Sequence, residues 1–367
     1  MLTSSHFDLA IIGGGPAGTA AAITAARLGA RVGLFEAHDF PRHKVCGEFL
    51  SGEALETLVD LLGNGVAAAS LMENAPVINR ARLWLGNRSV ETAVSPPGIS
   101  VLRYDLDLKL WEAAQAAGVD CRVNCEVSAT YGDGPFHLRT HHGSVSSRAL
   151  IVAAGRWSQF THDRTVLPGP KWLGVKAYFR EQDPNPDPST DLYFFDRGYC
   201  GVQPVAGDVV NACAMVRSDV ATSLADVFRL NPQLALRSHQ WVPMTQAFST
   251  APLIHRPPTP VRNKVAFVGD AAAFIDPFVG DGISIALRSG SVAAQCLSEF
   301  VAGRSPLEKC IAAYQAEYSR RFAPLLTIAS LARRLMTLPV AARALSFELL
   351  RFPGLIPLVI RKTRQAV

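Results

Sequence analysis

The sequence predicts an α/β fold with a parallel sheet, and the pattern of its N-terminal stretch supports this prediction. Residues 9–12 form an apolar run with no polar alternation, which is typical of a central parallel strand covered on both faces. An alanine-rich helical segment, 20–28, and a second apolar strand, 30–35, follow before Glu36. The turn between the first strand and the helix carries three glycines in the spacing G-x-G-x-x-G: Gly13, Gly15 and Gly18. This order of elements predicts a Rossmann-like dinucleotide-binding unit.

The glycine turn has a physical reason at each position. The first glycine makes the turn, the second lets backbone approach a pyrophosphate, and the third lets helix and strand pack closely. The carboxylate of Glu36 suits a ribose hydroxyl and would repel a 2′-phosphate. We expect the neighbouring residues Pro16, Ala17 and Ala37 to contact the same dinucleotide. The alternative, a glycine-rich turn in an ordinary βαβ unit, is disfavoured because all the features occur in register.

The composition limits the class of protein. With 367 residues and 49% hydrophobic content, the chain can form two domains or one large one with an ample core. The seven cysteines are odd in number and irregularly spaced, which predicts a reducing compartment and no disulfide framework. Cys121 and Cys125 have no second pair nearby, so we interpret them as packing residues and expect no metal site. We find no signal-peptide pattern and no apolar run long enough to cross a membrane, and expect a cytoplasmic protein.

The net charge of +5 comes from the C-terminal part of the chain. From Arg320 onward there are nine basic residues and one acid, Glu348, so this part carries +8 and the rest −3. Nucleic acid is a poor explanation, because the arginines are separated by apolar residues and no nucleic-acid module occurs. Two interpretations remain open: a helical lid over a hydrophobic substrate, or an amphipathic helix on an anionic membrane.

Three further segments complete a recognisable set with the glycine turn and Glu36. They are FPRHKVCG at 40–47, Arg103 followed by a helical pattern at 105–117, and VGDAAAFIDPFVGDG at 268–282. Together the four motifs resemble the flavoprotein monooxygenase superfamily, in the branch containing geranylgeranyl reductases and flavin-dependent halogenases. The resemblance extends over nearly the whole chain and implies tightly bound, non-covalent FAD as the cofactor.

The resemblance also implies roles for individual residues. Segment 40–47 would pack beside the isoalloxazine ring, Arg103 would contact the cofactor, and Asp270 would hold the ribityl chain. The further residues expected at FAD are Arg42, Lys44, Cys46, Gly47, Ala154, Gly155, Gly269, Pro277, Gly280, Asp281, Gly282 and Ile283. Ala154 replaces the acid of the family's Asp-Gly motif, which weakens the case for a pyridine-nucleotide site there. The last motif also makes sense unaided, because a helix beginning near Gly282 favours the negative charge of a reduced flavin.

Between these motifs the pattern predicts strands. We expect a hairpin at 81–85 and 89–94, strands at 121–127, 137–140 and 149–153, an antiparallel meander over 172–216, and a last strand within 242–254. The prediction is a discontinuous FAD domain with an inserted β-rich substrate domain. The FAD domain comprises 1–75, 98–165 and 260–303, the substrate domain 76–97 and 166–259, and the helical tail 304–367.

Three residues are candidates for catalysis. Cys46 would lie beside the ring, either as a reactive thiol or as a small packing residue. Glu48 would project toward the flavin as an acid or begin the following helix. Cys200 lies where halogenases of the family carry W-x-W-x-I-P, and its neighbours Gly201 and Gln203 also depart from that motif. Halogenation is therefore disfavoured. The assignment as a reductase also loses one supporting residue, because geranylgeranyl reductases often carry a tryptophan in this region.

The favoured function is hydride reduction of alkene bonds in a polyprenyl-like or related lipophilic compound. The alternative is a flavin-hydroperoxide monooxygenase that hydroxylates an aromatic or polyketide-derived ring, and a remote alternative is a non-catalytic flavin-binding, membrane-associated protein. The chain has no second dinucleotide fingerprint, so electrons would come from transiently bound NAD(P)H or a partner reductase.

Overall fold

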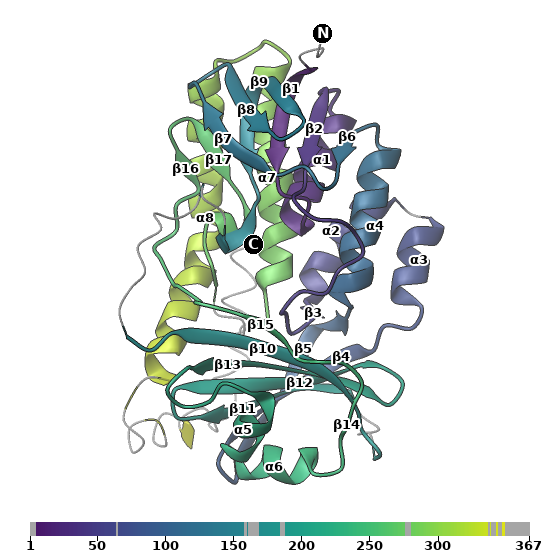
Figure 1. The fold of residues 1–367 in the computed structure, drawn as a ribbon, viewed down its shortest axis with the longest axis vertical. Coiled ribbons are helices and arrows are strands. Elements are labelled where there is room, and N and C mark those ends of the chain that lie inside the picture. The colour runs from purple at the N-terminus through teal and green to yellow at the C-terminus, as the bar shows by residue number, and fades with distance from the viewer. Residues whose placement is uncertain are drawn as a thin grey trace.

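Figure 1 shows the fold of the chain in a computed structural model. The structure describes residues 5–63, 65–157, 160, 169–183, 188–275, 280–336, 338, 343, 347 and 348. Within these residues the strands form two sheets, one of eight strands and one of nine. Figure 1 shows the first sheet with its helices above and the second sheet below, so the chain has the mixed α/β fold predicted from its sequence.

The first sheet has a parallel centre. Its strands β17 (Val265–Phe267), β9 (Gly143–Val152), β1 (Ser5–Ile12), β2 (Val32–Phe35) and β6 (Asp120–Arg122) lie side by side in this order. The edge strand β16 (Val261–Arg262) and the hairpin of β7 (Val127–Tyr131) and β8 (Phe136–Thr140) are antiparallel. Strands β1 and β2 are buried on both faces, which explains their continuous apolar sequence.

Helices pack beside this sheet and against one another. Helix α1 (Pro16–Arg27) packs against α7 (Gly282–Val301), where a Cβ on Gly290 would collide with the Ala17 carbonyl. Helices α2 (Gly52–Leu62), α3 (Val66–Met72) and α4 (Arg103–Ala116) lie toward the right in Figure 1. Helix α8 (Leu307–Met336) contacts the sheet through Tyr314, whose hydroxyl donates a hydrogen bond to the Phe267 carbonyl at 2.6 Å. Within the described residues, no helix is both long and apolar enough to cross a membrane.

The second sheet combines two regions of the sequence. Its order is β14 (Val242–Pro243), β10 (Trp172–Arg180), β13 (Val209–Arg217), β12 (Gly198–Ala206), β11 (Ser189–Phe195), β4 (Val77–Leu85), β5 (Arg88–Ser100) and β3 (Phe49–Leu50), and β15 (Phe248–Thr250) also pairs with β10. Helices α5 (Leu224–Arg229) and α6 (Pro232–Ser238) cover its outer face, where Val227 and Leu234 are fully buried. The other face looks toward the first sheet.

The strand predictions need three corrections. The hairpin of β4 and β5 turns at Gly86 and Asn87 as expected, but the strand expected at 121–127 is divided between β6 and β7. The strand expected within 242–254 is two short strands, β14 and β15. Segments 49–50 and 98–100, assigned to the cofactor domain from the sequence, pair within the second sheet instead. The pairings of β6 with β2, of β14 and β15 with β10, and of β3 with β5 join distant segments, which local sequence does not specify.

Candidate functional site

A cleft of about 1430 Å³ lies between the two sheets. The carboxyl ends of β1, β9 and β17 supply one wall through Gly13, Ala153 and Gly269, which is where open α/β sheets bind ligands. Residues of the second sheet and the segment that follows it supply the opposite wall, including Trp172 and Phe248.

The turn between β1 and α1 is held by Glu36. The carboxylate is 5% exposed and accepts hydrogen bonds from the backbone N–H of Gly14 at 2.8 Å and of His38 at 3.0 Å. The Arg42 guanidinium lies 2.9 Å from the same carboxylate. A Cβ built on Gly15 meets no atom within 4 Å, so this glycine faces open space at the start of α1. A helix N-terminus that faces open space suits a phosphate group.

Cations gather at this end of the cleft. Arg42 Nε is buried and has no hydrogen-bond partner among the described residues. Burial, together with the nearby charges of Arg42 and Arg103, lowers the pKa of Lys44 to about 8. Arg103 is held by Asp107, with Nε and Nη2 each 2.7 Å from a carboxylate oxygen. This environment would be stabilised by a bound anion.

The cleft also carries an acid and a second helix N-terminus. Burial raises the pKa of Asp270, while the charges of Arg156, Arg103 and Lys44 oppose the rise. Arg156 Nη1 lies 3.6 Å from the Asp270 carboxylate. Helix α7 begins at Gly282, and its first residues, Gly282 and Ile283, line the cleft.

Comparisons with known proteins agree with this geometry. Residues 8–57 match the family model described as FAD dependent oxidoreductase. The chain is 27% identical to a menaquinone reductase of Mycobacterium tuberculosis over 334 residues, covering 81% of this chain and 78% of the relative. It is 25% identical to a digeranylgeranylglycerophospholipid reductase of Methanococcoides burtonii, covering 86% and 80%. The chain is an FAD-dependent oxidoreductase.

Solved structures of flavin enzymes share the fold of this FAD-dependent oxidoreductase. A flavin-dependent brominase superposes with a TM-score of 0.81 at 21% identity, over 98% of this chain and 93% of the other. A geranylgeranyl bacteriochlorophyll reductase-like protein from Thermoplasma acidophilum superposes with a TM-score of 0.72 at 22% identity, over 99% and 92%. At these identities the likeness establishes the fold alone.

The residues present fit FAD. Gly15 leaves space for a pyrophosphate at the N-terminus of α1, and the unpartnered Arg42 Nε supplies a donor for an anion nearby. The predicted cofactor residues that line the cleft are Gly13, Gly15, Pro16, Ala17, Glu36, Ala37, Arg42, Lys44, Cys46, Gly47, Arg103, Ala154, Gly155, Gly269, Asp270, Gly280, Gly282 and Ile283. Gly18 instead packs against Gly13, and Asp281 precedes α7 as its N-cap. Pro277 lies outside the described residues.

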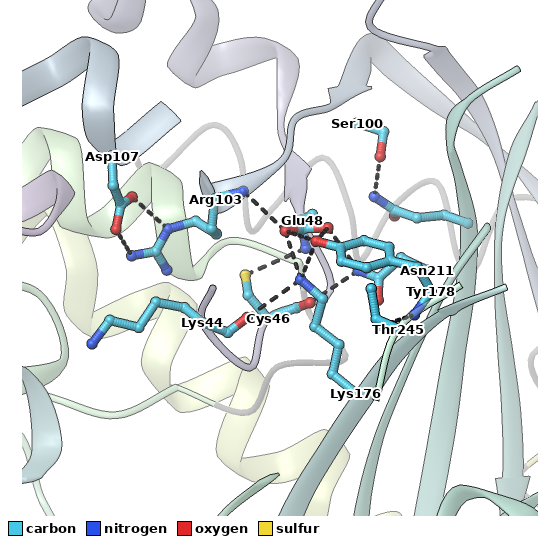
Figure 2. A network of polar contacts seen from close by, with 11 residues as sticks. Lys44, Cys46, Glu48, Ser100, Arg103, Asp107, Lys176, Tyr178, Asn211 and Thr245 are labelled. Atoms are coloured by element: carbon cyan, nitrogen blue, oxygen red, sulfur yellow. Dashed lines mark hydrogen bonds and ion pairs between the residues drawn. The ribbon is translucent and has the colours of Figure 1, made fainter. Parts of the chain in front are cut away.

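The three candidate catalytic residues lie in different environments. Cys46 lines the cleft, and its Sγ accepts a hydrogen bond from the Glu48 backbone N–H at 3.3 Å. Glu48 does not begin a helix, because α2 starts at Gly52. Glu48 is among the residues that line the cleft, but its side chain is fully buried and is bound by neighbouring side chains (Figure 2).

Cys200, the third candidate, does not line this cleft. Cys200 is fully buried among apolar side chains on the outer face of the second sheet, beneath α5 and α6. Burial raises the pKa of its thiol, and the residue does not line the cleft between the sheets. In a strand, successive side chains point to opposite faces, and Cys200 points away from the cleft toward α5 and α6.

Sequence reasoning missed the residues that bind Glu48. Lys176 and Tyr178 lie on β10, and Asn211 lies on β13. A lysine within the strand Trp172–Arg180, which is otherwise largely apolar, was an available signal, since a buried lysine requires a partner. The identity of that partner, 128 positions away in the sequence, was not available.

Proposed function

We propose that the protein uses FAD to reduce alkene bonds in a polyprenyl-like or related lipophilic compound. The observation that carries this proposal is the apolar wall of the cleft opposite the cofactor-binding turns. Its apolar side chains include Trp172, Phe248, Leu253 and Ile254, and apolar side chains of this kind suit a hydrocarbon chain. The names of two relatives, a menaquinone reductase and a digeranylgeranylglycerophospholipid reductase, support reduction of a lipid.

The chain must bind the alkene beside the cofactor, exclude water and deliver a proton. When bound, reduced FAD would supply the hydride equivalent for one alkene carbon, and the second carbon would require a proton from the protein or solvent. His43 and Lys44 are titratable and line the cleft on the cofactor-binding loop. The His43 ring lies against Tyr104 and Phe248, with ring centroids 4.8 and 4.6 Å apart. Electrons would enter from NAD(P)H or a partner reductase.

The name of a further relative, a 1H-pyrrole-2-carbonyl-[peptidyl-carrier protein] brominase that is 24% identical, supports a second candidate, an oxygen-dependent reaction on an aromatic or polyketide-derived ring. Halogenation itself has less support, because 198–204 lacks the tryptophans of the halogenase motif. The two candidates require opposite conditions, since the reduction proceeds without oxygen and hydroxylation consumes it.

The test is anaerobic reoxidation of the photoreduced protein. A geranylgeranylated lipid without a quinone ring is mixed with the reduced protein under argon, and its fully saturated analogue serves as the control. We expect flavin reoxidation with the unsaturated lipid alone and, by mass spectrometry, a gain of two hydrogen atoms for each reduced bond. Reoxidation only on admission of oxygen, with a hydroxylated product from an aromatic substrate, would overturn the proposal in favour of the second candidate. No reoxidation by any lipid and no oxygenated product would support a non-catalytic flavoprotein.

A further inference from the structure

A buried ion pair joins the cofactor-binding loop to the second sheet. Lys176 Nζ on β10 lies 2.6 Å from Glu48 Oε1, and both side chains are fully buried (Figure 2). Glu48 directly follows the segment Cys46–Gly47, which lines the cleft. A fully buried pair is costly to desolvate, so its presence at this position calls for a reason.

Side chains of the second sheet hold this loop at several points. Tyr178 donates its hydroxyl hydrogen to Glu48 Oε1 at 2.8 Å, and Asn211 donates to Glu48 Oε2 at 3.1 Å. Asn211 also donates to the Cys46 carbonyl at 3.0 Å. Lys176 donates to the Lys44 carbonyl at 3.3 Å. The sheet therefore binds alternate residues of the loop, two through their backbone and one through its side chain.

The Glu48 carboxylate also reaches the start of α4. Its Oε1 accepts a hydrogen bond from the backbone N–H of Arg103 at 2.9 Å. The guanidinium of Arg103 lines the cleft and is held by Asp107 at the next turn of the helix. One carboxylate thus connects the cofactor loop, the first turn of α4 and the second sheet, as Figure 2 shows.

The backbone of Glu48 adds a second cost. Its φ is +65°, a left-handed conformation that a glutamate rarely adopts. Backbone strain of this kind persists where the surroundings over-determine it, and such residues cluster at functional sites. At this left-handed residue the carboxylate lies inside the network, and the preceding segment Cys46–Gly47 lines the cleft.

We infer that Lys176, Tyr178 and Asn211 are positioning residues for FAD, acting through Glu48 on the loop 44–48 and on Arg103. They do not line the cleft, so their effect on the cofactor passes through the residues that do. The inference depends on FAD binding in the cleft and is independent of the substrate.

The test compares two buried glutamates that each pair with a cation beside β10. Glu48→Gln weakens the network, whereas the control Glu181→Gln weakens the pair of Glu181 with Arg237, whose N–O distance is 2.6 Å, away from the cleft. FAD dissociation, the visible circular dichroism of the bound flavin and the urea unfolding midpoint are measured for both proteins. We expect both variants to unfold at lower urea concentration, but only Glu48→Gln to raise the FAD dissociation constant, by about tenfold or more. Mutating residues that orient the ligands of a bound metal typically lowers metal affinity by a factor of this size.

Equal changes in flavin binding for both variants would overturn the inference, because the network would then act only through global stability. Wild-type binding and circular dichroism in Glu48→Gln would also overturn it. If Glu48→Gln does not fold, Tyr178→Phe and Asn211→Ala provide the same test with a smaller loss of folding stability. Wild-type flavin binding and circular dichroism in both variants would contradict the inference. The double variant Glu48→Gln/Lys176→Met removes both charges, so we expect its urea midpoint to recover while FAD binding remains weakened. Recovery of both properties would again mean a structural role only.

Discussion

At the scale of single residues, Gly15 and Gly18 have different physical roles although both belong to one motif. A Cβ on Gly15 would enter open space in the cleft, whereas a Cβ on Gly18 would collide with the Gly13 carbonyl. We expect Gly15→Val to abolish FAD retention while changing the free energy of unfolding of the apoprotein by no more than about 1 kcal/mol. Gly18→Val should instead lower the free energy of unfolding by about 1–3 kcal/mol, because the added side chain overpacks the core. Absorbance of the purified proteins and urea unfolding separate the two effects, and a fully yellow Gly15→Val protein would contradict the proposed pyrophosphate site.

The pKa of Lys44 predicts a pH dependence of FAD binding. In the free protein burial and neighbouring arginines lower this pKa to about 8, whereas a bound anionic cofactor stabilises the charged lysine and raises it. The FAD complex therefore binds an extra proton above pH 8. We expect FAD affinity to be steady below about pH 7 and to fall as the pH rises through 8, by at most about tenfold for each pH unit. Titrations with FAD from pH 6 to about 9.5 test this, and Lys44→Met should flatten the profile. An unchanged slope in that variant would assign the dependence to another group.

The residues of the site were predictable where the chemistry is local. The glycines and Glu36 lie within one βαβ unit, so their spacing alone placed them together. The environments of Glu48 and Cys200 could not be predicted, because residues of the second sheet form them. Lys176 neutralises Glu48 across 128 positions of sequence, and the choice of which face of β12 meets the cleft determines where Cys200 points.

At the scale of elements, α8 is joined to the first sheet by a buried polar contact. Tyr314 is fully buried and donates to the Phe267 carbonyl at the end of β17. We expect Tyr314→Phe to lower the free energy of unfolding by about 1–3 kcal/mol, because it leaves a buried acceptor without its donor. Urea unfolding measures the loss. Tyr131→Phe is the control, since this tyrosine is 53% exposed on β7 and should be nearly neutral. Equal stability of the two variants would show that α8 is held by apolar packing alone.

The elements also show what hydrophobic patterning can and cannot predict. Buried parallel strands such as β1 and β9 have long apolar runs, and their existence followed from the sequence. The two-residue strand β3 follows the strained Glu48 and exists because it pairs with β5. No periodicity can develop over two residues, so this pairing, which fixes the cofactor loop to the second sheet, was not predictable.

At the scale of the whole molecule, the uneven charge does not lie on one free surface. Arg320 and Arg321 pair with Glu317, and Arg333 lines the cleft. Arg343 is 7% exposed and donates to the Phe195 carbonyl of the second sheet at 3.1 Å. These contacts indicate that this part of the tail packs against the rest of the protein. They leave the basic residues beyond Arg351, which lie outside the described residues, as the candidates for membrane contact.

We propose that the end of the chain contacts anionic lipid through these residues. Arg361, Lys362 and Arg364 follow Arg351 with no acid among them. Near an anionic surface each basic residue contributes about 1 kcal/mol, so three together change association by on the order of 100-fold. Removing residues 352–367 should therefore lower sedimentation with phosphatidylserine vesicles by that factor at low salt. Binding to neutral phosphatidylcholine vesicles should be weak for both proteins, and high salt should reduce the difference because the attraction is screened. Equal sedimentation of the full-length and truncated proteins would exclude these residues as the membrane contact and leave packing over the cleft as the role of the tail.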